Sequence, residues 1–190
     1  NLQNFSFDLD KLKETITPNT KAIFLTHVLG INGLTDELLE LCEKNNILLI
    51  EDVCESHGTT FKGKKVGTYG HSSNFSFYFA HHMSTIEGGM VCTNDEKFYQ
   101  DFIFIHPAHN FRSTELNAVL GLSQIKKLDS KNVHRVNNFK YFMDRVDSEK
   151  YITDIEMDGQ CNYAFIVVLK EGTMDLRNRV ESELNKNGIE

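Results

Sequence analysis

The chain has 190 residues, which is enough for one domain, or for one domain and the start of another. An apolar fraction of 40% and a charged fraction of 25% exclude wholesale disorder, and two prolines and twelve glycines exclude collagen-like or proline-rich linker character. The formal net charge of −7 argues against a nucleic-acid partner, and no apolar run approaches the ~20 residues of a membrane span.

The four cysteines are widely separated and form no Cys-x-x-Cys pair. This spacing favours a protein with reduced thiols in the cytoplasm, although an even number of cysteines leaves a disulfide open. No charged-then-apolar leader segment opens the sequence.

Helices and strands alternate in the predicted pattern. A short amphipathic helix is expected over 7–16, a buried strand over 22–26, a helix capped by Thr35 and running to Asn45, and a second buried strand over 47–50. A strand, a helix and a strand at this spacing predict a βαβ unit with parallel pairing.

The second half of the pattern begins with a hairpin turn at 62–64. Strands are expected over 74–79 and 90–93, helices over 113–128 and 131–146, then a strand over 163–169 and a helix over 174–187. The fold class predicted is α/β, with a mostly parallel sheet flanked by helices and the start of a smaller α+β domain. We place the large domain at 1–129, and the linking helix with part of the small domain at 130–190.

Candidate functional side chains follow the strands, because ligands of α/β sheets lie beyond the carboxyl ends of their strands. Asp52 directly follows the second strand, and a carboxylate there suits a cationic ring nitrogen, although a capping role is equally consistent with its position. Ser76 lies on the third strand, and His81 and His82 follow it. His27, after the first strand, is expected to join them.

Two further interpretations stay open at this stage. A zinc site would combine His81 and His82 with His106 and His109, but the spacing is not typical of metal sites. Asn110 and Arg112 stand just before a predicted helix, where they would bind an anion. Equally, Ser113 with Glu115 nearby would be only a helix-entry device.

Several ordered motifs resemble the DegT/DnrJ/EryC1/StrS family of sugar aminotransferases, and the resemblance extends over 5–190. They are Ile50-Glu-Asp-Val-Cys-Glu-Ser-His-Gly58, Ser76-Phe-Tyr-Phe-Ala-His81, Glu87-Gly-Gly89 and Asn110-Phe-Arg-Ser-Thr-Glu-Leu-Asn-Ala118. The resemblance implies the type I fold of enzymes that use pyridoxal 5'-phosphate, a homodimer with active sites across the interface, and a sequence that lacks the N-terminal part of the large domain, including its phosphate loop.

One departure from the family pattern indicates the reaction. The family's cofactor-binding lysine lies five residues after the serine of the Ser-Phe pair, where this sequence has His81, and no lysine occurs between Val66 and Glu96. This pattern is similar to the dehydratase branch of the family. The absence of closely spaced cysteines favours the GDP-sugar members over those that need an iron–sulfur cluster.

The branch implies a lyase of deoxysugar biosynthesis, such as that of O-antigens. With pyridoxamine 5'-phosphate it would remove the C3 hydroxyl of a nucleotide-linked 4-keto-6-deoxy sugar, and glutamate would regenerate the cofactor. His81 would be catalytic, since imidazole moves protons near neutral pH but forms no C=N bond with the cofactor aldehyde. The alternatives are a nucleotide-sugar aminotransferase and a non-catalytic protein of the same fold.

By resemblance, five further positions bind the cofactor. Asp52 would pair with the pyridine nitrogen and Cys54 would pack on the ring. Ser76 and Asn110 would bind the phosphate, with Asn110 acting in the neighbouring subunit. Glu55 departs from the Gln or His usual near the ring hydroxyl. The segment 100–102 is also shorter than the family's substrate loop.

Overall fold

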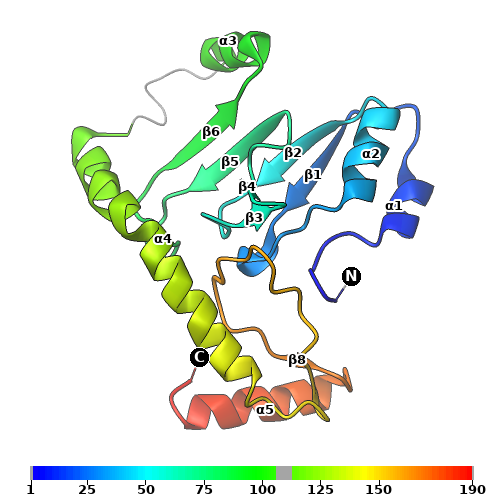
Figure 1. Cartoon of the computed structure of the whole chain (residues 1–190), viewed down its shortest axis with the longest axis vertical. Helices are drawn as coiled ribbons and strands as arrows, with labels where there is room; N and C mark the ends of the chain where they lie inside the picture. The colour runs from blue at the N-terminus through cyan, green and yellow to red at the C-terminus, as the bar shows by residue number, and fades with distance from the viewer. Residues whose placement is uncertain (1, 106–112, 190) are drawn as a thin grey trace.

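The computed structural model describes residues 2–105 and 113–189. Figure 1 shows a β-sheet with α1 and α2 on one side and the long helix α4 on the other, and α5 at the far end of α4. The elements in chain order are α1 (Leu9–Thr15), β1 (Ala22–Thr26), the 3₁₀ turn η1 (Val28–Gly30), α2 (Asp36–Lys44), β2 (Leu48–Asp52), β3 (Thr60–Phe61), β4 (Lys64–Lys65), β5 (Ser72–Ser76), β6 (Gly89–Thr93), α3 (Glu96–Ile105), α4 (Glu115–Met143), β7 (Tyr151–Ile152), β8 (Val168–Leu169) and α5 (Met174–Lys186).

The main sheet has the strand order β1-β2-β5-β6. β1, β2 and β5 run parallel, as the predicted βαβ unit requires, whereas β6 is antiparallel to β5. The register places Thr26 beside Asp52, and Asp52 beside Asn74. The carboxyl ends of three parallel strands therefore meet at one edge of the sheet, where a ligand site is expected.

The first core lies between this sheet and α2. Alternate residues of β1, Ile23 and Leu25, are buried, and they pack with Leu38 of α2. Leu38 is fully buried, which stabilises the fold by about 1.5–3 kcal/mol relative to an exposed leucine. The hydroxyl of Thr35 accepts the N–H of Leu38 and caps the helix, as predicted.

Helix α4 differs most from the sequence prediction. The helices expected over 113–128 and 131–146 form one continuous helix of 29 residues, so the expected break is wrong. The 129–131 segment contains no glycine or proline, and the Ser130 hydroxyl donates to the carbonyl of Lys127 within the helix. Thr114, not Ser113, caps the helix, in a reciprocal arrangement with Asn117. The domain boundary proposed near residue 129 stays a prediction.

A second core joins α4 to the segment that follows β7. Phe139 of α4 is completely buried among Ile31, Ile155 and Ile166. The expected strand over 163–169 is reduced to β8, which pairs with β7. The N–H groups of Cys161 and Tyr163 instead donate to carbonyls of the loop after β1. These N–H groups are therefore not available to pair with a strand.

Smaller differences occur at two other places. The strand expected over 74–79 begins at Ser72 and ends at Ser76, and helix α3 was not predicted. The hairpin of β3 and β4 and the helix α5 were predicted correctly apart from their ends. Within the described residues, no helix combines the length and the hydropathy that crossing a membrane requires.

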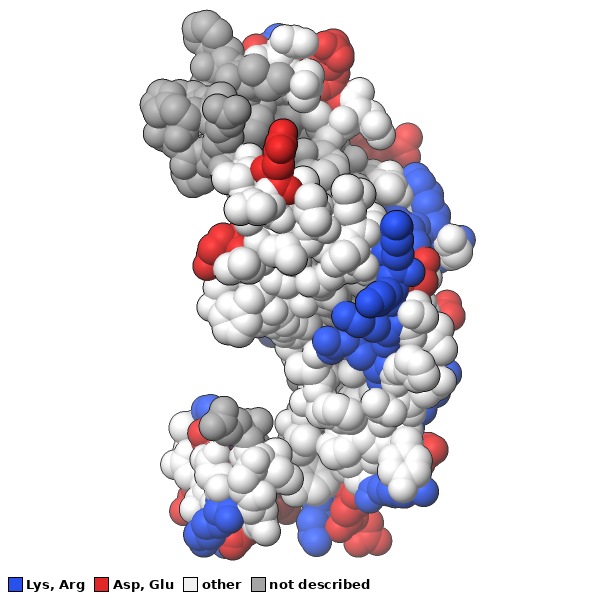
Figure 2. Space-filling model, turned by 90° about the vertical axis from the view of Figure 1, so that its left-hand side faces the viewer, with Lys and Arg blue, Asp and Glu red and all other residues white. Residues whose placement is uncertain are grey.

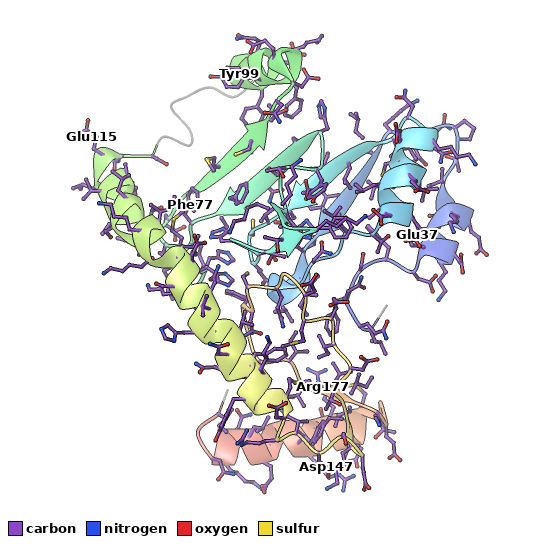
Figure 3. The ribbon with its side chains drawn as sticks, in the orientation of Figure 1. Glu37, Phe77, Tyr99, Glu115, Asp147 and Arg177 are labelled. Atoms are coloured by element: carbon purple, nitrogen blue, oxygen red, sulfur yellow. The ribbon has the colours of Figure 1, made fainter. Side chains whose placement is uncertain are left out.

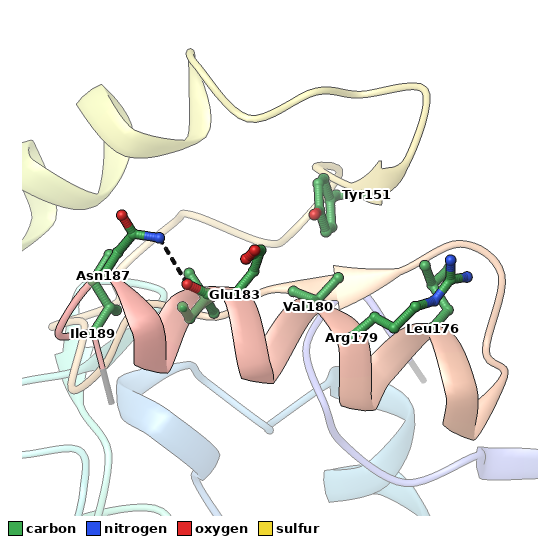
Figure 4. Close-up of a pocket in the computed structure, with 8 residues that line it drawn as sticks. Tyr151, Leu176, Arg179, Val180, Glu183, Asn187 and Ile189 are labelled. Carbon is green, nitrogen blue, oxygen red and sulfur yellow. Dashed lines mark hydrogen bonds between the residues drawn. The ribbon is translucent and has the colours of Figure 1, made fainter.

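A groove of about 570 Å³ lies between α5 and Tyr151, lined by apolar side chains that include Leu176 and Val180 (Figure 4). Because α5 lies at the opposite end of α4 from the main sheet, this groove is separate from the carboxyl edge of the strands (Figure 1).

Candidate functional site

Asp52 stands at the carboxyl end of β2, and the neighbouring strand fixes its side chain. Its Oδ1 accepts the amide of Asn74 on β5 at 2.9 Å and the backbone N–H of Cys54 at 3.0 Å. Both of these hydrogen bonds use Oδ1, and Oδ2 is the second oxygen of the carboxylate. Since Asp52 is only half-buried, this second oxygen can receive a donor from a ligand.

Cys54 lies beside this carboxylate. The Asn74 amide approaches its Sγ at 3.2 Å. Burial, together with the hydrogen bond and the negative charge of Asp52, raises the pKa of the Cys54 thiol to about 12. The thiol is therefore neutral at physiological pH, so its chemistry is that of a small apolar group and not that of a nucleophile.

Glu55, in the loop that follows β2, binds the loop that follows β1. Its Oε2 accepts the backbone N–H of Leu29, a residue with a positive φ of 55°, at 2.9 Å. The Ser56 hydroxyl donates to the carbonyl of His27 at 2.6 Å. The loops after β1 and β2 are thus tied together at the carboxyl edge of the sheet.

The segment that follows β5 brings His81 to this edge. The Ser76 hydroxyl accepts the N–H of Tyr78, and the carbonyl of Tyr78 accepts the N–H of His81 at 3.0 Å, which turns the chain sharply. Phe77, labelled in Figure 3, is the first residue beyond β5. Farther along, Gln124 of α4 holds the segment through two hydrogen bonds to the backbone of Ser84.

Three imidazoles and one phenol gather where this segment meets the rest of the chain. The ring of Tyr163 lies 5.6 Å from that of His81 and 5.5 Å from that of His82, between ring centroids. The ring of His57 is 6.3 Å from His81 and 6.0 Å from His82. The Nδ1 atom of His81 is buried and has no partner among the described residues.

Two of these histidines are uncharged at neutral pH. Burial, together with the nearby charges of His82 and His81, lowers the pKa of His57 to about 4. Burial also lowers the pKa of His82 to about 4, with a contribution from the charge of Arg135. The Nε2 of His82 lies 3.3 Å from both the carbonyl and the sulfur of Cys161. His82 therefore packs inside the protein, while His81 stays half-buried at the edge.

The expectation that His27 joins the site is wrong. Its ring is completely buried, its Nε2 lies 3.1 Å from the Glu51 carboxylate, and its Nδ1 accepts the N–H of Gly33 at 3.1 Å. Since both ring nitrogens are engaged inside the protein, His27 cannot contact a ligand at the strand ends.

Glu51 is a buried carboxylate that the sequence analysis did not single out. It accepts backbone N–H groups from Gly67, Tyr69 and Gly70 at 2.6–2.8 Å, besides the contact with His27. Burial raises its pKa, but the hydrogen bonds from His27, Gly67 and Gly70 outweigh burial and the net shift is downward. This carboxylate fixes the turn that leads into β5, and thus the edge where Asp52 and Asn74 meet.

The structure brings together most of the predicted site, although it leaves the roles of the residues as predictions. Asp52, Cys54, Glu55, Ser76 and His81 lie on adjoining loops and strand ends. Asn110, His106 and His109 lie outside the described residues. Among the residues that are described, no group of three side chains of metal-ligand type is placed to hold an ion.

Asn74 and Tyr163 are the members of the site that sequence reasoning missed. Asn74 lies beside Asp52 in the register of β2 and β5. This position can be recognised only when the pairing of the two strands is known. Tyr163 comes from a segment that was expected to be a strand, more than eighty residues after His81.

Comparison with known proteins finds relatives that are similar in sequence and in fold. The model of the DegT/DnrJ/EryC1/StrS aminotransferase family matches residues 1–190. A GDP-4-keto-6-deoxy-D-mannose 3-dehydratase from Yersinia pseudotuberculosis is 32% identical over 220 aligned positions, which cover 99% of this chain and 56% of the relative.

Two solved structures are similar along the whole chain. One is a GDP-4-keto-6-deoxymannose-3-dehydratase variant with bound GDP-perosamine, with a TM-score of 0.91 and 28% identity. The other is the Escherichia coli GDP-4-keto-6-deoxy-D-mannose-3-dehydratase with bound hydrated PLP, with a TM-score of 0.87 and 29% identity. Each match covers 100% of this chain and 57% of the solved chain, so the chain spans little more than half the length of these relatives. From the ordered motifs, the fold and the family match, the chain belongs to the DegT/DnrJ/EryC1/StrS aminotransferase family.

Proposed function

We propose that this chain is part of an enzyme that dehydrates a nucleotide-linked 4-keto-6-deoxy sugar at C3 with pyridoxamine 5'-phosphate. The observation that carries the proposal is the imidazole of His81 at the position where family aminotransferases have their lysine, in the segment that follows β5, the strand paired with that of Asp52. The similarity to the GDP-sugar 3-dehydratases supports the same reading and suggests GDP-4-keto-6-deoxymannose as the substrate.

The side chains at the strand ends fit this cofactor. The two hydrogen bonds that Asp52 accepts from Asn74 and Cys54 both use Oδ1, and the buried Nδ1 of His81 is unpartnered within the described residues. Unpartnered buried polar atoms are rare unless a ligand or a solvent molecule satisfies them. A ligand whose ring N–H donates to the Asp52 carboxylate, and whose polar reacting centre contacts His81, would suit both side chains.

Each side chain would make a contact that suits its chemistry. The Asp52 carboxylate would keep a proton on the ring nitrogen, because a close negative charge favours the protonated form. The Ser76 hydroxyl, which already accepts the Tyr78 N–H, keeps its proton free to donate to a phosphate. The neutral Cys54 thiol would pack on the ring face, and Glu55 would border the site while holding Leu29.

When bound, pyridoxamine phosphate supplies an amine that condenses with the C4 ketone and a ring that accepts electrons. His81 supplies the proton transfers around it. Its imidazole would take up a proton as base and deliver one to the departing C3 hydroxyl oxygen of the sugar as acid, since an imidazole has one nitrogen that accepts a proton and one that donates. Because imidazole forms no C=N bond with the cofactor aldehyde, the cofactor stays free to act as the amine.

The partners are part of the same proposal. Glutamate would restore the cofactor amine, and the protein would act as a homodimer in which Asn110 serves the neighbouring site. Figure 2 shows the face that carries α4, where charged residues are sparse over much of the surface. Leu116, Val119, Leu122 and Ile125 of α4 are exposed apolar side chains, and a second copy would cover them. The four cysteines are free thiols, which supports a cytoplasmic location.

The decisive assay incubates the full-length protein with GDP-4-keto-6-deoxymannose, pyridoxamine phosphate and glutamate. We expect a 3-deoxy sugar by mass spectrometry. A 4-amino sugar as the only product would show an aminotransferase instead. If the protein binds no pyridoxamine phosphate at equilibrium, the non-catalytic alternative is correct.

A second experiment tests the position of His81. The variant His81→Lys is expected to form a covalent C=N bond with added pyridoxal phosphate, which gives a new absorbance band. His134→Lys is the matched control, because His134 is an exposed histidine of α4. An unchanged spectrum for His81→Lys would show that residue 81 does not face the cofactor.

A further inference from the structure

Tyr163 is the aromatic residue closest to His81 among the described ring contacts. Its ring lies 5.6 Å from the His81 imidazole with an interplanar angle of 38°, closer than the rings of Tyr78 and His57, which are both at 6.3 Å. The Tyr163 ring also borders His82 at 5.5 Å. A planar side chain thus lies against both histidines of the pair.

The backbone of Tyr163 is fixed on both sides. Its N–H donates to the carbonyl of Leu29 at 2.9 Å, and its carbonyl accepts Nη1 of Arg135 at 3.1 Å. Gly30 permits this close approach, because a Cβ at Gly30 would lie 2.8 Å from the Tyr163 nitrogen. The chain before it is held as well, since the N–H of Cys161 donates to the Gly30 carbonyl. The ring position is therefore set by the loop after β1 and by α4.

The His81 side chain has few restraints of its own. It lies in an irregular segment between β5 and β6, and its buried Nδ1 has no partner among the described residues. His82, in contrast, has Nε2 within 3.3 Å of the carbonyl and sulfur of Cys161. The orientation of the His81 imidazole consequently depends on the rings around it, of which Tyr78 is 40% exposed.

We propose that Tyr163 is a positioning residue, whose ring holds the His81 imidazole in the orientation needed for proton transfer. The proposal rests on the function proposed above. A catalytic imidazole must keep its geometry closely, because a displacement of about 1 Å can cost ~100-fold in rate. Tyr163 would meet that need through the contact of its ring, which is tilted by 38° against the imidazole, so the hydroxyl is dispensable.

The test compares Tyr163→Leu with Tyr163→Phe in the full-length protein. Tyr163→Leu should lower kcat by about tenfold to a hundredfold with KM changed by less than about twofold, whereas Tyr163→Phe should restore kcat. In ¹H–¹⁵N spectra of the imidazoles, assigned with His81→Asn, the His81 signals should move in Tyr163→Leu and stay in place in Tyr163→Phe. This second readout needs neither cofactor nor turnover.

The matched control is Phe165→Leu, which removes a ring from the same segment. The Phe165 ring packs 6.0 Å from Phe139 and 5.0 Å from Phe142 of α4 and not on the histidines, so the His81 signals and kcat should stay near wild type. Unmoved His81 signals in Tyr163→Leu would overturn the proposal, and so would a Tyr163→Phe variant as slow as Tyr163→Leu. If the wild type lacks dehydratase activity, the proposed reaction fails while the spectra still decide the role of Tyr163.

Discussion

Replacing Glu51 with glutamine tests how the strand edge beneath the site is built. Each oxygen of the buried carboxylate has two partners: Oε1 accepts the N–H groups of Tyr69 and Gly70, and Oε2 accepts that of Gly67 and contacts His27. In Glu51→Gln, one of these positions becomes an NH₂ group that faces two donors. Each lost hydrogen bond to a charged group costs about 1.5–3 kcal/mol, so we expect a loss of about 3–6 kcal/mol of unfolding free energy.

Urea unfolding followed by circular dichroism measures this loss. With a slope of ~2 kcal/mol per molar urea, the midpoint should fall by about 1.5–3 M at pH 7. The control Glu40→Gln changes an exposed glutamate of α2 and should stay within about 0.5 kcal/mol of the wild type.

The pH dependence provides a second check on the same carboxylate. Its pKa in the folded protein lies below the usual value of 4.5, so its stabilising contribution is complete above pH 4.5 and is lost as the pH falls through the lowered pKa. Glu51→Gln has no such titration, and its deficit relative to the wild type should shrink over that range. A deficit below about 1 kcal/mol at pH 7 would refute the described role of Glu51.

Two further predictions concern the surroundings of His81. In Gly30→Ala, the new Cβ would lie 2.8 Å from the Tyr163 nitrogen at a φ of +86°, so we expect a loss above ~1–2 kcal/mol in urea unfolding, and unchanged stability would contradict the close approach. His57 and His82, with pKa values of about 4 against an ordinary 6.5, stabilise the fold fully above pH 6.5 and lose that contribution as the pH falls toward 4. Unfolding free energies at pH 7, 6 and 5 should therefore decline, and His57→Phe should flatten part of the decline; an equally steep decline in the variant would show that His57 does not contribute.

The first half of the fold could be predicted because local patterns determine it. The alternation in β1, the capping Thr35 and the apolar face of α2 each concern residues close in sequence, and the parallel unit follows from their spacing. Asp52 was placed correctly at the end of its strand for the same reason. Helix α4 was expected as two helices, although continuous hydrogen bonding and the burial of Phe139 favour one helix.

The site depends more on contacts between distant segments. His27 and His81 both follow strands, yet one is enclosed with Glu51 and the other stays at the edge. Periodicity does not distinguish them, because the direction of a side chain beyond the end of a strand depends on the loop that it enters. Tyr163 could not be assigned at all, since its place is set by hydrogen bonds to Leu29 and from Arg135.

The sequence by itself determined the family, the parallel strand–helix–strand unit and the imidazole that replaces a lysine, because ordered motifs and short-range periodicity are properties of the chain. Only the tertiary structure decided which polar groups meet: Asn74 with Asp52, Glu51 with the turn before β5, and Tyr163 with His81. Such pairs join residues far apart in the chain, and burial and strand register select them only after the chain has folded.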